Sequence, residues 1–537
     1  MFYDTDRNLV IYDKQEAPLL KPIPGTDNFY ARATLENLQA LRAHDIDVPP
    51  IMNYRYDWPR LRRVIPKPFA AQVVTANHAA LHPRSFVLND MRTGKTLSCL
   101  WAADYIMREA EARGLTVRCL IVCPLSTVRS VWVDAVNTHF MGRRKIINTH
   151  NAAAKRRRQL IETPADFYVM NIDGVKIGVK KTWRGIDLEK GGLAEHIKSR
   201  ADIQIIIIDE ASGFRDAQST RSKAAQTVFE NKLFLWALTG TPTPNQPTDA
   251  HGLRRLVDPD YRESFKSVKE RMMYHVGGFK WAPRPDGYIQ AAQLLTPAVR
   301  FKKEHCFDMP PQLQTARDAE FSAEQAELYE ALRLAMRAEL AGGEIDAVHE
   351  GALRLKLLQI ACGAVYDGAH VAHEVDCSGR LSVLKEAMEE ADCGPKGEGK
   401  CLIFAPFTST VNLLRKHLND WYKQGHAIRC ITGAVSPKER AEIVSKFQSS
   451  GEPRVIIADP GTMAHGLTCT AANTIIWYAP TDKPENWAQG NERILGASQK
   501  NTTLVVKIAI TKTEREIYER LNNKQSMQGV MLSMLEG

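Results

Sequence analysis

The chain has 537 residues, of which 44% are hydrophobic and 25% charged, a composition typical of a folded, soluble protein and not of a disordered chain. No apolar run is long enough to span a membrane, and Met1–Leu9 carries Asp4, Asp6 and Arg7, unlike a secretory leader. The net charge of +9 is mildly basic for this length, and the ten cysteines include no C-x-x-C pair, so we expect free thiols in a reducing, cytoplasmic compartment.

Residues 1–65 are predicted to form a small N-terminal accessory segment. Leu35–Arg42 has the pattern of a short helix, and Pro49, Pro50 and Pro59 interrupt the chain after it. A solvated linker is an equally good interpretation of this region.

Strands and helices are predicted to alternate over residues 66–259. Five continuous apolar runs are strand candidates, as expected for parallel strands buried on both faces: Ser85–Leu88, Cys119–Cys123, Phe167–Met170, Ile203–Ile208 and Leu233–Leu238. With helical patterns between them, they predict a doubly wound α/β domain. Such a domain binds its ligand at the C-terminal ends of the strands.

The first of these strands is followed by a phosphate-binding pattern. A turn-like stretch leads to Gly94, Lys95 and Thr96 at the start of a helical pattern. Gly94 lets the backbone approach phosphate oxygens, Lys95 supplies a point charge to the β- and γ-phosphates, and the Thr96 hydroxyl can bind Mg²⁺. The usual spacing places a further glycine where this chain has Asn89, so the pattern is incomplete.

Two further strand ends carry polar side chains. The run IQIIIIDE, Ile203–Glu210, delivers two adjacent carboxylates: Asp209 can hold Mg²⁺ through water, and Glu210 can deprotonate the attacking water. The next strand is followed by LTGTPTP, Leu238–Pro244, whose hydroxyls can hydrogen-bond the acidic pair and sense the γ-phosphate. Taken alone, that loop would be interpreted as an ordinary Pro-rich turn.

Residues 260–375 are predicted to be a helical insert or linker. They contain two long amphipathic stretches, Glu324–Leu340 and Ile345–Ala361, separated by Gly342 and Gly343. Alternation then resumes over residues 376–537, with strand candidates at Cys401–Phe404, Ala427–Thr432, Val455–Ala458, Thr474–Tyr478 and Thr503–Ala509 and a closing helix from Thr513 to about Leu521. The predicted fold class is therefore α/β, with two lobes, a helical insert and a cleft between the lobes.

Basic clusters lie outside these motifs. Two of them are Lys155–Arg158 and a group around Trp183 made of Lys176, Lys180, Lys181 and Arg184; in the insert, Lys280 and Trp281 lie near Arg284 and Tyr288. Basic residues interleaved with aromatic ones suit a nucleic-acid groove, although any one cluster also fits a solvated surface.

Taken together and in chain order, the motifs resemble superfamily 2 helicases, and among them the Swi/Snf-type DNA translocases, especially the compact versions of bacteriophages. NDMRTGKT (Asn89–Thr96) is similar to motif I, whose form in that family also lacks the first glycine, and DEAS (Asp209–Ser212) is similar to motif II. LTGTPTPN is similar to motif III. The resemblance covers Pro66 to about Leu521 and implies two RecA-like lobes with doubly wound parallel sheets.

The resemblance also implies roles for individual residues. Glu210 and Arg493 would be catalytic, and ATP would be bound by Gln72 (reading adenine), Thr93, Gly94, Lys95, Thr96 and Asp209, with Thr96 and Asp209 serving the metal. Residues coupling ATP to movement would be Thr239, Gly240, Thr241, Gly466 and Gln489. DNA contacts would come from Ser126, Asn171, Thr432, Gly433, Lys280 and Trp281.

One position departs from the family pattern. Gln489–Gln499 is similar to motif VI, which carries two arginines three residues apart, but here Arg493 is followed by Gly496. The second arginine normally acts as an arginine finger, which supplies roughly 10³–10⁵ in rate. Either Arg493 acts alone, or another cation such as Lys500 substitutes, or hydrolysis is slow.

The predicted function is that of a DNA-dependent ATPase using ATP and Mg²⁺ and acting as a translocase on DNA, with duplex preferred and single strands as an alternative. The family implies a replication, recombination or repair setting, in the cytoplasm of a bacterial host if the chain is phage-encoded. Two other functions stay open: a strand-separating DNA or RNA helicase, and an ATP-gated DNA-binding clamp with little hydrolysis, which Gly496 suggests. No membrane partner is expected.

Overall fold

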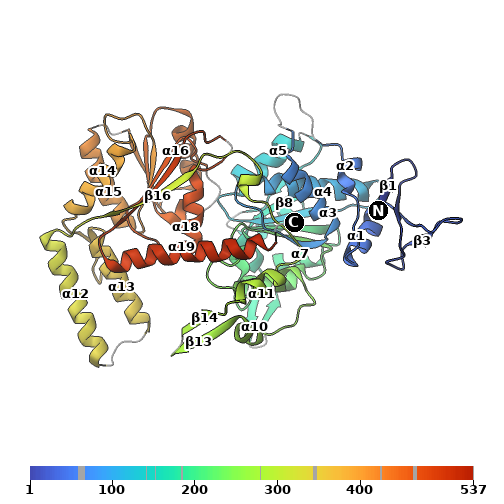
Figure 1. The fold of residues 1–537 in the computed structure, drawn as a ribbon, viewed down its shortest axis with the longest axis horizontal. Coiled ribbons are helices and arrows are strands. Elements are labelled where there is room, and N and C mark those ends of the chain that lie inside the picture. Colours follow the sequence, from blue (N-terminus) through green and yellow to red (C-terminus); the bar gives the residue numbers. More distant parts are fainter. Residues whose placement is uncertain are drawn as a thin grey trace. The chain divides into compact units, whose positions relative to one another are not determined.

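The structure is a computed structural model that describes residues 1–58, 67–140, 142–150, 153–182, 185–277, 280–342, 347–369, 371–423, 426–463, 468–496 and 498–535 (Figure 1). The chain forms two compact units. Unit 1 contains Met1–Phe307 and Met527–Gly537, and unit 2 contains Asp308–Ser526. Each unit is built around one parallel sheet, so the predicted fold class of two parallel-sheet α/β lobes is confirmed.

Unit 1 begins with a small antiparallel sheet that the sequence pattern did not predict. Its strands, in spatial order, are β1 (Phe2–Asp4), β2 (Leu9–Tyr12), β4 (Phe29–Arg32) and β3 (Lys21–Pro22). Helices α1 (Leu35–Ala43) and α2 (Ile51–Arg55) follow, and Thr34 caps α1 by accepting a hydrogen bond from the backbone N–H of Asn37. The buried side chains of Leu38 and Met52 belong to the same core as the main sheet, so this segment is an integral part of unit 1.

The main sheet of unit 1 has seven strands, and every pair in it is parallel. In spatial order the strands are β15 (Ala298–Val299), β5 (Arg84–Val87), β12 (Phe234–Leu238), β11 (Ile203–Asp209), β6 (Arg118–Cys123), β8 (Phe167–Asn171) and β7 (Ile146–Asn148). The five predicted strands are confirmed. The short edge strands β7 and β15 were missed, because two or three residues give no detectable pattern.

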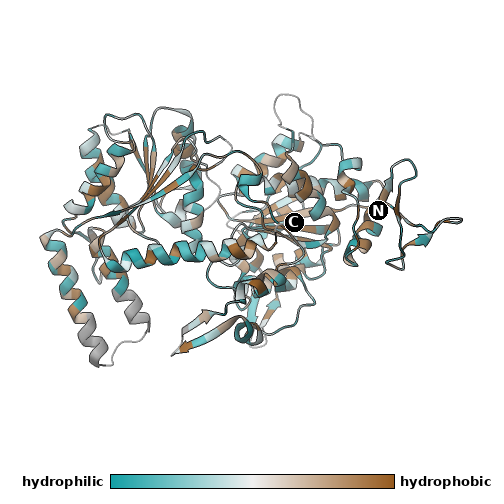
Figure 2. Ribbon diagram, viewed as in Figure 1, coloured by the Kyte–Doolittle hydropathy of each residue, from teal (hydrophilic) through white to brown (hydrophobic). Residues whose placement is uncertain are grey.

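The isoleucine run of β11 shows why the sheet is buried on both faces. Ile205 and Ile207 pack into one core layer, whereas Ile206 and Ile208 pack into the other, and all four are fully buried. The first layer is covered by α3 (Ala70–Leu81), α4 (Lys95–Glu111) and α5 (Asp134–Phe140). The second is covered by α6 (Ala154–Glu162), α7 (Leu193–Ser199), α8 (Thr220–Phe229), α9 (Asp249–Val257), α10 (Phe265–Met272) and α11 (Gly287–Leu294). Figure 2 shows the hydrophobic strands between these more mixed helices.

Two hairpins extend from unit 1. One is formed by β9 (Val179–Thr182) and β10 (Gly185–Leu188), and the other by β13 (Met273–Gly277) and β14 (Lys280–Pro283). The C-terminal end of α19 (Lys512–Ser533) also belongs to unit 1, where Met531 and Leu532 are buried in the second core layer.

The sheet of unit 2 has six strands, again all parallel. In spatial order they are β16 (Gln312–Asp318), β23 (Thr503–Ala509), β22 (Thr474–Trp477), β19 (Cys401–Phe404), β21 (Val455–Ala458) and β20 (Ile428–Ile431). Helices α14 (Ser378–Glu390) and α15 (Thr408–Tyr422) cover one face, and α16 (Pro437–Ser449), α18 (Pro484–Asn491) and the first part of α19 cover the other (Figure 1).

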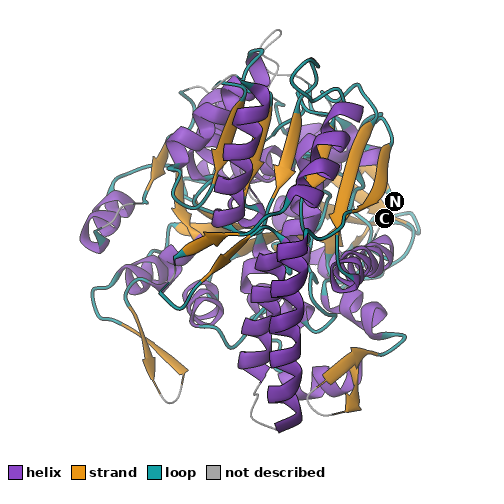
Figure 3. Cartoon of the chain, turned by 90° about the vertical axis from the view of Figure 1, so that its left-hand side faces the viewer, coloured by secondary structure: helices purple, strands orange, loops and turns teal. Residues whose placement is uncertain are grey.

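The remaining elements of unit 2 are a helix pair, a hairpin and a short helix. Helices α12 (Ala323–Gly342) and α13 (Ala347–Ala361) correspond to the two predicted amphipathic stretches, and they lie side by side (Figure 3). Strands β17 (Ala364–Tyr366) and β18 (Ala372–Glu374) form the hairpin, and α17 (Pro460–Met463) follows β21. The closing helix, expected to end near Leu521, continues to Ser533.

The structure divides the chain differently from the predicted boundaries. Residues 260–307 of the predicted insert belong to unit 1, because β15 pairs with β5, whereas residues 308–375 belong to unit 2, because β16 pairs with β23. The predicted insert is therefore not one body. Within the described ranges, no helix is both long and apolar enough to cross a membrane.

Candidate functional site

The phosphate-binding pattern forms a loop between β5 and α4. Gly94, the residue before α4, has φ +79°, in the left-handed region that favours glycine. A Cβ built on Gly94 would lie 2.1 Å from the Gln72 Nε2 atom, so the structure brings the predicted adenine-reading glutamine against this loop. The side-chain oxygen of Gln72 accepts a hydrogen bond from the Phe69 backbone N–H at 3.2 Å, which fixes the amide at the start of α3.

Lys95 holds the loop together from inside. Its ammonium group donates to the backbone carbonyls of Asn89 and Asp90, both at 2.8 Å. The Thr93 hydroxyl donates to the same Asp90 carbonyl at 2.8 Å. Burial lowers the pKa of Lys95, and the nearby carboxylates of Glu210, Asp209 and Asp90 oppose that shift. Thr96 follows in the first turn of α4, where backbone N–H groups and the helix dipole favour an anion.

The acidic pair lies at the end of β11, two strands from the loop. Asp209 accepts a hydrogen bond from the Trp132 indole N–H at 3.0 Å and another from the Glu210 backbone N–H at 3.1 Å. Burial raises the pKa of Asp209, although both of these donors and the Lys95 ammonium oppose the shift. Glu210 has φ +51°, so the chain turns sharply directly after Asp209. Trp132 lies in the helical segment that follows β6, and nothing in the sequence indicated that it holds Asp209.

Strand β12 lies between β5 and β11, so it places the LTGTPTP loop between the phosphate loop and the acidic pair. The Thr239 backbone N–H donates to the carbonyl of Val87, the last residue of β5, at 3.1 Å, and the Thr239 hydroxyl accepts from the Thr241 N–H at 3.0 Å. A Cβ on Gly240 would lie 3.4 Å from the Met91 side chain of the phosphate loop. The Thr241 hydroxyl is buried and has no hydrogen-bond partner in the described part of the chain. Of the residues predicted for coupling, Thr239 therefore contacts the end of β5, and Gly240 lies beside the phosphate loop.

A segment more than 200 residues away secures the loop from its other side. Arg300, which follows β15, donates to the Leu88 carbonyl at 2.7 Å and to the Asp90 carboxylate at 2.6 Å. The Phe301 N–H donates to the Asn89 side-chain oxygen at 3.0 Å, while the Asn89 amide donates to the Thr75 hydroxyl at 2.8 Å. Asn89, in the position where the common pattern has glycine, thus ties the loop to β15 and α3. The sequence offered no sign of Arg300, because no spacing rule connects such distant residues.

The predicted DNA-contact residues of unit 1 lie in three places. Ser126 is partly exposed in the turn after β6. Asn171 ends β8, and its side-chain oxygen accepts from the Arg157 guanidinium at 2.8 Å and lies 3.0 Å from the His150 Nδ1 atom. Trp281 lies on β14, in the second hairpin with Lys280. The Lys269 ammonium, which was not predicted, sits 4.1 Å from the centre of the Trp281 ring.

Unit 2 contains the remaining predicted residues. Thr432 is buried and Gly433 exposed directly after β20, whereas Gly466 lies outside the described residues. Gln489 on α18 is fully buried, and neither its amide nitrogen nor its oxygen has a hydrogen-bond partner in the described part of the chain. Arg493 is buried on the turn that follows α18. Gly496 has φ +150°, a conformation that side chains rarely adopt.

Comparisons with known families agree with this arrangement. The SNF2-related domain matches residues 72–361, more than half of the chain, and the helicase conserved C-terminal domain matches residues 380–496. The chain therefore belongs to the SNF2-related family, in superfamily 2, and its two matched domains make it an ATP-hydrolysing enzyme of the helicase class.

Individual relatives are distant. The chain is 25% identical over 335 residues to an uncharacterized ATP-dependent helicase of Mycoplasma genitalium, covering 61% of this chain and 31% of that protein. It is 21% identical over 505 residues to protein p41 of Acyrthosiphon pisum secondary endosymbiont phage 1, covering 89% of this chain and 100% of that one. It is 20% identical to the DNA repair and recombination protein RAD54-like of Gallus gallus, covering 83% of this chain and 63% of that protein.

A similar solved structure is the SWI2/SNF2 ATPase core of Sulfolobus solfataricus in complex with dsDNA. It is 20% identical, the match covers 88% of this chain and 94% of that one, and the TM-score is 0.38. This chain spans about a third of the length of the cellular helicase relatives that match it, such as the Mycoplasma protein.

Proposed function

We propose that this protein is a DNA-dependent ATPase that moves along duplex DNA. The observation that carries the proposal is the meeting of three motifs at one edge of the unit 1 sheet. Lys95, the Asp209–Glu210 pair and Thr239 follow β5, β11 and β12, which are neighbouring parallel strands. A phosphate cradle, an acidic pair and a hydroxyl-bearing loop at one edge are what phosphoryl transfer to water requires.

The phosphate loop fits ATP in specific ways. The absence of a side chain on Gly94 leaves room beside Gln72, which we propose reads adenine. The Lys95 ammonium now donates to two backbone carbonyls and would exchange them for phosphate oxygens, with Thr93 and Thr96 at either side of Gly94 and Lys95. Burial disfavours the charged form of Lys95, and three nearby carboxylates favour it. The ammonium charge would then bind the phosphates of ATP.

The residues also fit Mg²⁺. Asp209 is a carboxylate whose charged form is disfavoured by burial, so a cation beside it is favourable, and Thr96 would supply a hydroxyl ligand. In the described part of the chain no cluster of three or more His, Cys, Asp or Glu forms a metal cage. One carboxylate and a hydroxyl suit Mg²⁺, which keeps waters and phosphate oxygens as its other ligands. When bound, Mg²⁺ would neutralise charge on the phosphate oxygens.

Glu210 is proposed as the general base. Trp132 and the Glu210 N–H donate to the two carboxylate oxygens of Asp209, and the chain turns at Glu210 directly after it. Glu210 would accept the proton of the attacking water. Arg493 of unit 2 is proposed to stabilise the transferred phosphoryl group.

The Thr239–Thr241 loop is proposed to report the state of the γ-phosphate. Thr239 hydrogen-bonds the end of β5, and the unpartnered Thr241 hydroxyl can accept or donate to a new group. Gln489, whose amide is buried without a partner in the described residues, and Gly466 are proposed to couple unit 2 to the same cycle. DNA would be held by Ser126, Asn171, Thr432, Gly433, Lys280 and Trp281.

A second candidate function is an ATP-gated DNA-binding clamp. Gly496 favours it, because this glycine stands where the family has its second arginine. Its φ of +150° is a backbone conformation that residues with a side chain rarely adopt. The RAD54-like relative, which is named for DNA repair and recombination, supports a setting in DNA replication, recombination or repair. The phage relative supports a bacterial cytoplasm as the location if the gene is viral.

Steady-state ATP hydrolysis without DNA, with single-stranded DNA and with duplex DNA tests the proposal. We expect stimulation mainly by duplex, lost in Lys95→Ala and Glu210→Gln, the second by roughly 10²–10⁴. Lys198→Ala and Glu230→Gln are matched controls, because this lysine and this glutamate form a partly exposed ion pair in unit 1. Stimulation by single strands, together with DNA or RNA unwinding, would favour the strand-separating helicase. If the unmodified protein hydrolyses ATP no faster than Lys95→Ala and Glu210→Gln, the ATP-gated DNA-binding clamp is the function that is supported.

A further inference from the structure

The basic stretch around Trp183 is divided by the fold into paired and unpaired cations. The Lys176 ammonium lies 2.8 Å from the Asp173 carboxylate, and the Lys180 ammonium lies 3.6 Å from that of Glu189. Lys181, next in the chain, forms no ion pair with any described residue. Of the three lysines of this cluster, Lys181 is therefore the one whose charge is not compensated within the part of the chain that the structure describes, whereas Arg184 lies outside the described residues.

The hairpin register explains this division. In the β9–β10 pair, Lys181 lies opposite Ile186 and Lys180 lies opposite Asp187. Because side chains alternate between the faces of a strand, Lys181 and Ile186 share one face, and Lys180 and Asp187 share the other. One face of the hairpin thus carries Lys180, which is paired with Glu189. The other face carries the Lys181 ammonium group, which has no carboxylate partner among the described residues.

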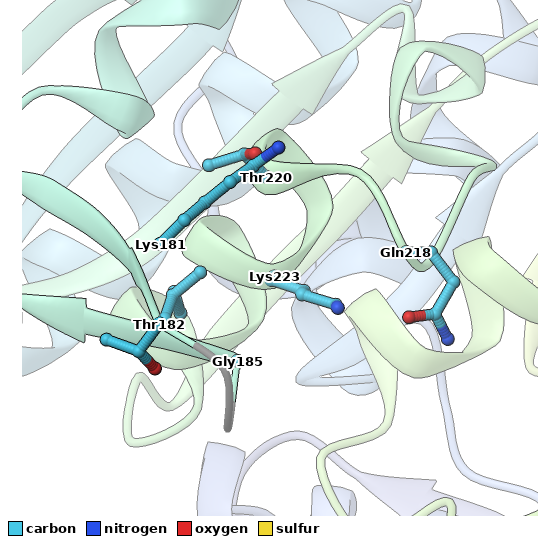
Figure 4. A pocket seen from close by; sticks show the side chains of 7 residues that line it. Lys181, Thr182, Gly185, Gln218, Thr220 and Lys223 are labelled. Atoms are coloured by element: carbon cyan, nitrogen blue, oxygen red, sulfur yellow. The ribbon is translucent and has the colours of Figure 1, made fainter.

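The uncompensated face borders a cavity of about 300 Å³ between the hairpin and the start of α8. It is lined by Lys181, Thr182, Gly185, Ile186, Gln218, Thr220 and Lys223. Figure 4 shows these side chains around the cavity, with Lys181 of the hairpin reaching toward Thr220 and Lys223 pointing toward Gln218. The lining contains two lysines, two threonines and a glutamine but no carboxylate. Lys223, like Lys181, has no ion-pair partner among the described residues.

The walls of this cavity are fixed relative to Asn171. The short 3₁₀ turn Ile172–Lys176 links Asn171 to the hairpin, and its Asp173 carboxylate accepts from the Arg221 guanidinium of α8 at 2.7 Å. Arg221 lies between Thr220 and Lys223, so the ion pair holds α8 against the turn that precedes the hairpin. The two lysines are therefore presented by elements that are already connected, which lowers the entropy cost of binding a ligand between them.

We propose that this cavity, the Lys181–Lys223 site, binds a phosphodiester group of the DNA backbone. Two ammonium groups without competing carboxylates favour a phosphate, and hydroxyl and amide side chains can donate to its remaining oxygens. Connection to Asn171, a proposed DNA contact, favours a nucleic-acid phosphate over a free anion. The proposal rests on the proposed function and adds a phosphate contact that no motif of the family pattern supplied.

The test is the salt dependence of duplex DNA binding, measured by fluorescence anisotropy without ATP. We expect the double variant Lys181→Gln/Lys223→Gln to reduce the slope of log Kd against log salt by about one to two, and to weaken binding roughly 10-fold at low salt. The control double variant Lys180→Gln/Lys198→Gln removes the same charge from lysines that are paired with carboxylates. Its slope is expected to stay close to that of the unmodified protein.

Three outcomes overturn or separate the proposals. An unchanged slope in the Lys181/Lys223 variant, with DNA binding intact, overturns this site and leaves the ATPase proposal standing. Binding of inorganic phosphate that the double variant loses, without a change in the DNA slope, identifies a small-anion site and also overturns it. If the unmodified protein binds no duplex at any salt concentration, the proposed function itself fails. Thermal unfolding of both double variants checks that each is folded.

Discussion

The Arg300 guanidinium and the Asp90 carboxylate form an ion pair at 2.6 Å that fixes the phosphate loop to the edge strand β15. Arg300 is only 6% exposed, and its second nitrogen donates to the Leu88 carbonyl. Asp90 in turn offers its backbone carbonyl to Lys95 and Thr93. An arginine outside every recognised motif therefore holds the loop together with Lys95 and Asn89.

Arg300→Met is expected to weaken both folding and ATP binding. It leaves the Leu88 carbonyl without its donor and the Asp90 carboxylate without its counter-ion, and breaking such a pair costs about 3 kcal/mol. We expect a lower unfolding temperature and a KM for ATP raised about 10-fold or more. Arg42→Met, which breaks the exposed pair with Asp47, is the control and should cost less than about 1 kcal/mol.

A double-mutant cycle sharpens this test. If the pair acts as a unit, Asp90→Asn and Arg300→Met combined should cost clearly less than the sum of the two single changes. Arg300→Lys keeps the charge but lacks the guanidinium fork that reaches both the Leu88 carbonyl and the Asp90 carboxylate. Its KM for ATP should therefore lie between those of the unmodified protein and Arg300→Met. An unchanged KM for ATP in Arg300→Met would contradict the assigned role.

Gly94→Ala is expected to abolish nucleotide binding. The new Cβ would collide with the Gln72 amide, and a non-glycine residue at φ +79° adds roughly 1–2 kcal/mol of backbone strain. Gly114→Ala separates the two effects, because Gly114 has φ +73° but no atom within 4 Å of its Cβ. Binding of a fluorescent ATP analogue should be lost in the first variant and retained in the second. Equal loss in both would show that a substitution at a left-handed glycine abolishes binding through the fold and not through contact with Gln72.

Parts of this arrangement could be predicted from the sequence and parts could not. The isoleucine run of β11 and the apolar run of β19 are continuous, so their burial and type follow from composition alone. Strand β16, QLQTARD, is polar and mostly exposed at the sheet edge, and it becomes a strand only because β23 offers free backbone groups. The Lys95 and Asp209 side chains were found because they follow strands in a fixed local pattern. Arg300 and Trp132 act on them across long chain distances, where local patterns give no information.

The stability of unit 1 is expected to depend on pH through Lys232. Lys232 is 4% exposed, its ammonium group donates to the carbonyls of Lys198 and Arg200 at 3.1 and 2.8 Å, and burial lowers its pKa from 10.5 to about 8. Between pH 8 and 10.5 the unfolded chain therefore binds more protons than the folded one, so the free energy of unfolding rises with pH in that window.

The comparison with Lys232→Met isolates this contribution. The difference in unfolding free energy between the unmodified protein and the variant should increase from pH 8 to 10.5, by up to about 3 kcal/mol. Lys155→Met, at an exposed lysine of α6, controls for the loss of one positive charge. A difference that stays constant, or falls, across the window would show that the buried ammonium carries no such penalty.

Arg493 is expected to carry the electrostatic catalysis that two arginines share in the usual motif VI. Arg493→Ala should lower kcat by about 10³-fold or more with a smaller change in KM, whereas Lys500→Ala, at an exposed lysine, should change kcat little. Arg493→Lys keeps the charge and should recover part of the rate, which separates catalysis from the packing of a buried side chain.

Restoring the second arginine is not expected to help. Gly496 has φ +150°, so the Gly496→Arg variant must either strain the backbone or change its path. We expect no gain in kcat and a lower unfolding temperature. A higher kcat in Gly496→Arg would show instead that the backbone adapts to the side chain. It would also show that hydrolysis is slow because position 496 lacks a positive charge. A large loss in Lys500→Ala would assign the missing charge to that lysine.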